Sequence, residues 1–68
     1  MKIKERLSPI ESQIIHHIVN EMPNKRIAQE MNYSQRTVEY HINKISKKFE
    51  VHTRVGIVVK AFRENFIE

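Results

Sequence analysis

The stretch "NYSQRTVEYHINKISKKF", residues 32–49, carries the clearest helical pattern in this chain. Ser34 can cap a helix, because its hydroxyl can accept a hydrogen bond from a free N–H group of the first turn. One apolar stripe follows at helical spacing, within an arc of about 60°, and consists of Val38, Ile42, Ile45 and Phe49. The stretch therefore predicts a helix over residues 35–49 with one buried side.

The opposite side of this helix carries hydrogen-bond donors and acceptors. It consists of Arg36, Tyr40, Asn43 and Lys47, with Glu39 at its edge. Contact with solvent alone is the ordinary reason for such a mixture. The tyrosine argues for more, because a merely solvated surface gains little from a large aromatic ring.

The residues before this helix predict a shorter helix and a tight turn. We expect the shorter helix over residues 24–31, with Asn24 as its cap. Its buried edge consists of Ile27, Ala28 and Met31. Asn32 stands where that helix must end, and asparagine tolerates the left-handed backbone conformation better than most residues. Two short helices joined by "MNYS", residues 31–34, match a helix-turn-helix unit.

A first helix and the domain boundaries follow from the start of the chain. Ser8 and Glu11 have the spacing of a capping box around Pro9, and Pro23 ends the helix that they open. We interpret residues 1–7 as a frayed start or a linker end, and residues 8–68 as one domain. The predicted fold is all-α, a four-helix domain with a central helix-turn-helix and helices at about 9–22, 24–31, 35–49 and 54–65.

The last of these helices is expected to begin after Thr53, which can cap it. Its inward stripe is predicted to consist of Val55, Val58, Val59, Phe62 and Phe66. Ile57 and Ala61 then point nearly the opposite way and form an outer apolar pair.

The composition restricts the class of protein. A chain of 68 residues is one domain at most and can bury only a small core. It has no cysteine, hence no disulfide framework and no thiolate metal site, which fits a reducing compartment and predicts a cytoplasmic protein. No apolar run approaches the roughly 18 residues of a membrane span. No catalytic, metal-ligand or phosphate-loop pattern is present, so we expect no enzyme activity, no metal and no cofactor.

The charge distribution favours an anionic partner. The formal net charge is +4, and residues 25–54 account for all of it, with seven basic and three acidic side chains. In helix-turn-helix units the second helix enters the major groove of DNA, and we expect residues 35–49 to do so. Arg36 suits guanine, Asn43 suits adenine and Glu39 suits cytosine.

The expected contacts form two groups. The candidates for reading bases are Arg36, Glu39, Tyr40, Asn43 and Lys47. The candidates for holding phosphates lie on a flank of the same helix, and are Thr37, His41, Lys44 and Lys48.

Three segments together resemble a known family. "LSPIESQIIHHIV", "PNKRIAQEMNYSQRTVEYHINKISKKF" and "VHTRVGIVVKAF" are similar to the LuxR/GerE-type DNA-binding domain of bacterial transcription regulators, which is also the output domain of NarL-type response regulators. The resemblance covers residues 7 to about 67. It implies sequence-specific binding of double-stranded DNA in transcription regulation, with Lys25 as a further phosphate contact. It also implies that the last helix pairs two copies on an inverted repeat, with interface candidates Ile57, Lys60, Ala61 and Glu64.

Three positions depart from the family pattern. Glu39 stands where a lysine is common, so the phosphate or guanine contact that a lysine makes does not carry over to this position. Asn32 replaces the common glycine of the turn. Gly56 replaces a common glutamate in the first turn of the last helix, so we expect that capping box to be lost and the helix start to be weaker.

Two other interpretations remain open from the residues alone. A sigma-factor region 4 domain shares the first three helices, but it usually stops after its recognition helix. A helical protein-interaction module without DNA affinity would not need the basic recognition side. The expected partners are double-stranded DNA, a second copy of the chain on DNA and, as a further candidate, RNA polymerase; no membrane partner is expected.

Overall fold

The computed structural model describes residues 7–65, and residues 1–6 and 66–68 lie outside this range. The described chain forms four helices and no strand: α1 (Pro9–Val19), α2 (Asn24–Met31), α3 (Gln35–Phe49) and α4 (Arg54–Arg63). The predicted all-α fold with four helices is confirmed. Most of the predicted frayed or linker segment, residues 1–7, falls outside the described residues, and its last member, Leu7, packs against the core.

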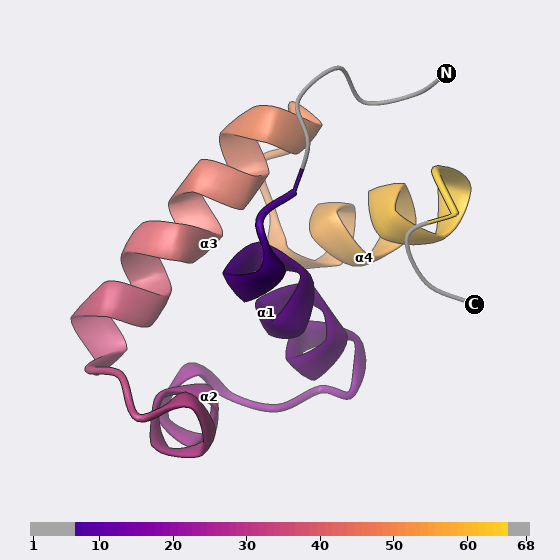
Figure 1. Cartoon of the computed structure of the whole chain (residues 1–68). Helices are drawn as coiled ribbons and strands as arrows, with labels where there is room; N and C mark the ends of the chain where they lie inside the picture. The colour runs from indigo at the N-terminus through magenta and orange to yellow at the C-terminus, as the bar shows by residue number, and fades with distance from the viewer. Residues whose placement is uncertain (1–6, 66–68) are drawn as a thin grey trace.

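Helix α1 lies at the centre of the arrangement (Figure 1). It packs against both α3 and α4, which also contact each other, while α2 packs against α3. The largest fully buried side chains come from all four helices. One of them is the charged Glu11 of α1, and the apolar ones are Ile14, Ile15, Ile27, Val38, Ile45, Phe49 and Ile57. Each such apolar side chain contributes about 1.5–3 kcal/mol when buried. This one shared core therefore fixes which side of α3 faces outward.

The predicted stripe of α3 is confirmed. Val38, Ile45 and Phe49 are almost completely buried, and Ile42 is half-buried against the same core. Ser34 caps the helix, because its Oγ accepts a hydrogen bond from the Thr37 N–H at 3.1 Å.

The turn between α2 and α3 also has the predicted form. Asn32 adopts the left-handed conformation with φ of 58° and ψ of 41°. The Tyr33 N–H then donates to the Ala28 carbonyl at 2.9 Å, and Ala28 itself is buried. A small side chain at position 28 and an asparagine at position 32 together allow the two helices to meet closely.

Helix α1 ends earlier than predicted, at Val19 instead of residue 22. Glu21 adopts a left-handed conformation with φ of 62°, and the chain turns there. Pro23 gives the reason, because a proline restricts the residue before it and its ring would clash with the carbonyl four residues earlier in a continuing helix. Helix α4 also stops short, at Arg63 rather than at residue 65.

The predicted cap of α2 is wrong. Pro23 occupies the cap position without a side-chain hydrogen bond, and Asn24 is the first helical residue. The Oδ1 atom of Asn24 instead accepts a hydrogen bond of 2.7 Å from Arg54 Nη1, and Arg54 Nη2 donates to the Met22 carbonyl at 2.6 Å. Arg54 therefore ties the start of α4 to the start of α2.

The predicted orientation of α4 is also wrong. Ile57 and Ala61 are fully buried, whereas Val55 is 71% exposed, Val59 45% and Phe62 46%. Of the predicted inward stripe, Val58 packs against the core and is half-buried. Phe66 lies outside the described residues.

Gly56 accounts for this rotation of α4. It faces Val51 in the short loop after α3 so closely that an added Cβ would lie 2.9 Å from the Val51 Cβ. With that side of the helix turned to the loop, Ile57 points into the core. The small Ala61, one turn later, allows close packing there. Thr53 still caps the helix, because its Oγ1 accepts a hydrogen bond from the Gly56 N–H at 2.9 Å.

Candidate nucleic-acid interface

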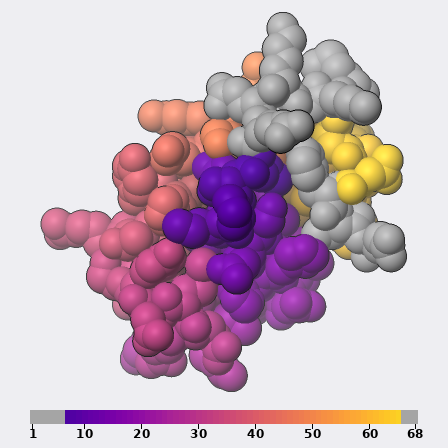
Figure 2. Space-filling model, in the orientation of Figure 1, coloured from indigo at the N-terminus to yellow at the C-terminus, as the bar shows by residue number. Residues whose placement is uncertain are grey.

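The outward side of α3 is open. Figure 1 shows α3 along one edge of the molecule, and the space-filling view shows side chains of α3 projecting from that edge (Figure 2). All five candidates for reading bases are exposed: Arg36, Glu39, Tyr40, Asn43 and Lys47. They share one side of α3 because Val38, Ile45 and Phe49 hold the other side in the core. We call this side the reading face.

Tyr40 is the one large apolar group on the reading face. The Lys44 Nζ atom lies over its ring, 5.6 Å from the centroid. The His41 ring approaches it edge-on with a centroid distance of 5.2 Å, and the Tyr33 ring lies 6.2 Å from that histidine. The flank of α3 toward α2 therefore carries a row of aromatic and basic groups.

Thr37 and Lys44 lie on the flank of α3 that the helical spacing predicted for them. Thr37 is half-buried beside the cap, and its Oγ1 accepts a hydrogen bond from Ser34 Oγ at 2.9 Å. Lys44 is exposed next to the reading face. A hydroxyl and an ammonium on this flank have the chemistry of phosphate contacts.

Lys48 differs from the other flank residues, because its ammonium already has a partner inside the protein. Its Nζ atom lies 2.7 Å from Glu11 Oε1, and the side chain is only 17% exposed. Glu11 is buried at the start of α1, where its Oε1 also accepts a hydrogen bond from the Ser8 N–H at 2.8 Å. Lys48 is therefore no longer a phosphate candidate: it is a half-buried link from α3 to the buried carboxylate of α1.

The electrostatics of Glu11 fit this role. Burial raises the pKa of its carboxyl group, but the hydrogen bonds from Lys48 and from the Ser8 backbone, together with the charge of Lys48, outweigh burial. The net result is a pKa below the ordinary value. The carboxylate therefore remains ionised and keeps the lysine bound.

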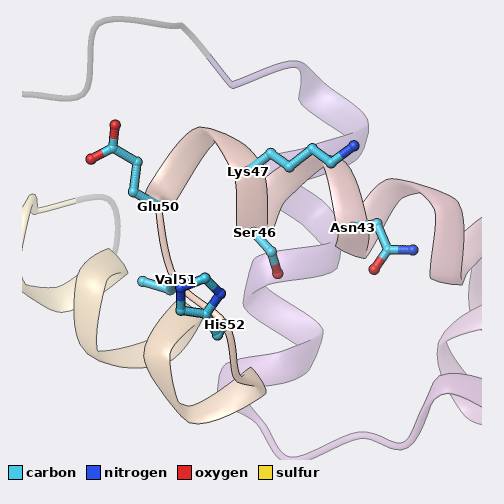
Figure 3. Close-up of a pocket in the computed structure, with 6 residues that line it drawn as sticks. All are labelled: Asn43, Ser46, Lys47, Glu50, Val51 and His52. Atoms are coloured by element: carbon cyan, nitrogen blue, oxygen red, sulfur yellow. The ribbon is translucent and has the colours of Figure 1, made fainter.

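A hollow of about 660 Å³ adjoins the C-terminal half of the reading face. Its lining consists of Asn43, Ser46, Lys47, Glu50, Val51 and His52. Figure 3 shows Ser46 projecting from α3 on the side where His52 lies, and Lys47 extending along the helix toward Asn43. The sequence did not indicate this hollow, because the positions of Val51 and His52 depend on the path of the loop after α3, which no helical spacing specifies.

Other kinds of site find no support in the described chain. Residues 7–65 contain no group of three or more histidine or acidic side chains that could hold a metal ion. None of the helices in the same range is long and apolar enough to cross a membrane.

The model of a known family, described as bacterial regulatory proteins of the luxR family, matches residues 5–61. This match covers most of the chain. The chain belongs to the luxR family. Membership assigns this helix-turn-helix domain to DNA-binding regulation of transcription, and the family is one of DNA-binding proteins rather than enzymes.

Individual relatives in the luxR family are response regulators. A nitrate/nitrite response regulator homologue from Haemophilus influenzae is 33% identical over 61 residues, which cover 90% of this chain and 29% of that protein. The Escherichia coli response regulatory protein YgeK is 36% identical over 58 residues, 85% of this chain and 40% of that protein. The chain thus spans well under half the length of these relatives.

A solved structure agrees with the fold. The response regulator ChrA of a heme-sensing two-component system superposes with a TM-score of 0.90 at 26% identity, over 97% of this chain and 33% of that one. The described helices therefore have the arrangement of a response-regulator DNA-binding domain.

The structure locates the phosphate candidate in α2 and the interface candidates in and after α4 that the luxR resemblance implied. Lys25 is exposed in the first turn of α2, whose first N–H groups have no side-chain cap. Of the four interface candidates, Ile57 and Ala61 are fully buried, and Lys60 and Glu64 are half-buried. Buried side chains cannot meet a second copy, so Ile57 and Ala61 are withdrawn. The outer side of α4 instead presents Val55, Val59 and Phe62.

Proposed function

We propose that this domain binds specific sequences of double-stranded DNA with α3 in the major groove. One observation carries the proposal: five side chains able to contact bases are exposed on a single open face, directly across from the stripe that packs into the core. Arg36 would bind guanine, Asn43 adenine and Glu39 cytosine, each through the hydrogen-bonding edge that its side chain matches.

The DNA backbone would be held on the flank of α3 and at the start of α2. Thr37, His41 and Lys44 lie beside the reading face, and Lys25 stands at a helix N-terminus, where the helix dipole favours a phosphate. These four contacts are sequence-independent, and they fix how α3 sits in the groove.

Pairing on an inverted repeat is the second part of the proposal. The resemblance to LuxR/GerE-type domains implies pairing through the last helix, and here the outer side of α4 offers Val55, Val59 and Phe62. Three side chains cover far less than the roughly 1,200 Å² of a stable interface, so we expect pairing on DNA rather than strong dimers in free solution. In the cytoplasm such a pair would regulate transcription, with RNA polymerase as the candidate protein partner.

Selection of bound duplexes from a random pool tests the main proposal, followed by titrations of two variants. Asn43→Ala should weaken the preferred site by about 1–3 kcal/mol and relax the preference at one base pair. Lys44→Ala should weaken all sequences alike and reduce the salt dependence by about one counterion. A preferred site unchanged by Asn43→Ala would contradict the register proposed for α3, and a pool without any preferred sequence would favour a protein-interaction module.

A further inference from the structure

Tyr40 is the reading-face residue that hydrogen bonding to bases leaves unexplained. Its side chain is 57% exposed, although an aromatic ring is stabilised by burial. Its neighbours on the reading face carry guanidinium, carboxylate, amide and ammonium groups, which match the polar edges of bases. The ring is the group suited to an apolar feature of the groove.

The ring is also supported from the side. Lys44 Nζ lies 5.6 Å from its centroid, and His41 meets it edge-on at 5.2 Å. His41 in turn lies against Tyr33, which is half-buried in the turn before α3. These contacts restrict the ring before any DNA is present, so less conformational freedom is lost on binding.

We propose that Tyr40 reads the 5-methyl group of a thymine in the major groove. Thymine is the base whose edge there carries an apolar group, and apolar side chains recognise it by contact with that methyl. The electron-rich face of an aromatic ring favours such a neighbour. This inference rests on the proposed function and adds the chemistry of one base position to it.

Uracil isolates the contact, because it differs from thymine only by lacking the methyl group. Removing one buried methyl should weaken binding about fourfold. The hydrogen-bonding groups of the base pair are unchanged, so the other contacts of the reading face remain.

The experiment uses the duplex selected from the random pool, with each thymine of a half-site replaced in turn by uracil. Equilibrium titrations compare the wild-type chain with Tyr40→Phe and Tyr40→Ala. We expect the about fourfold loss at one thymine for the wild type and for Tyr40→Phe, and no difference between thymine and uracil there for Tyr40→Ala. Asn43→Ala is the matched control: it should bind more weakly but keep the thymine-to-uracil ratio.

Each other outcome would overturn the inference. Equal binding of all uracil duplexes would remove the methyl contact, and an unchanged ratio in Tyr40→Ala would assign it to another side chain. Loss of the ratio in Tyr40→Phe would assign it to the hydroxyl instead of the ring. Circular dichroism verifies that the variants remain folded. Selection from the random pool tests the proposed function separately: a preferred sequence there, without a methyl contact here, would overturn only the role of Tyr40.

Discussion

At the scale of single residues, position on a helix and availability for binding are different properties. Lys44 and Lys48 lie one turn apart on the same flank of α3. Lys44 is exposed, whereas Lys48 donates to the buried carboxylate of Glu11, 37 residues away in the sequence. Helical spacing predicts the shared flank, but it contains no information on a partner from α1. The same residue type is therefore available to a partner at position 44 and is engaged within the fold at position 48.

Lys48→Ala should destabilise the domain strongly. It leaves the carboxylate of Glu11 buried without its charge partner, and breaking a buried pair in this way costs on the order of 3 kcal/mol. Denaturant unfolding measures the loss, with Lys44→Ala as the exposed control, for which little change is expected. A Lys48→Ala domain that is as stable as the wild type, yet binds DNA with a smaller salt dependence, would return Lys48 to the phosphate contacts.

The pair of Glu11 and Lys48 also makes the stability of the fold depend on pH in the acidic range. Because the pKa of Glu11 is lowered in the folded state, its stabilising contribution is complete above the pKa of an unfolded glutamate, about 4.3, and disappears as the pH falls through the lower folded value. The wild type should therefore lose stability on acidification below about pH 4. This loss of stability should be smaller in Lys48→Ala.

At the scale of helices, the buried side can be predicted from the sequence only when the apolar residues lie on one side of the helix. In α3 the apolar residues fall on one side, and the structure buries that side. In α4 both sides are apolar, and three members of the larger set, Val55, Val59 and Phe62, are exposed, while Val58 is half-buried against the core. Counting apolar residues gives the wrong side there, because the close approach of Gly56 to Val51 decides the rotation and is a tertiary contact.

Gly56→Ala tests that explanation. A glycine-to-alanine change inside a helix ordinarily stabilises by about 1 kcal/mol. Here the new Cβ would lie 2.9 Å from the Val51 Cβ and 3.2 Å from Thr53 Oγ1, and overpacking of this kind costs about 1–3 kcal/mol. We therefore expect a net loss of stability in thermal unfolding. Gly56→Glu, which restores the common family residue, carries the same Cβ and should also destabilise. A raised melting temperature for Gly56→Ala would mean that Val51 does not set the rotation of α4.

At the scale of the whole molecule, the fold separates the two surfaces for which binding is proposed. Helix α1 lies between α3 and α4, so the reading face and the outer side of α4 belong to different parts of the surface (Figure 1). Arg54 links the start of α4 to the start of α2, because it begins α4 and donates a hydrogen bond to Asn24, which precedes Lys25. The sequence predicted the residues of the reading face, which depend on one helix. The surface of α4 and the hollow near His52 depend on how helices and loops meet, and were not predicted.

The last prediction concerns the surface of α4. If two copies pair through α4, a two-fold axis that passes close to Val59 brings this residue of one copy next to the same residue of the other, as an isologous contact requires. Val59→Asp would place two like charges in that contact, so binding to a full inverted site should weaken by about tenfold or more, while half-site affinity stays nearly unchanged. Gln13→Asp, an exposed change on α1 with the same added charge, is the control for general repulsion from DNA. Equal losses on full and half-sites, or no loss on either, would remove the outer side of α4 as the pairing surface.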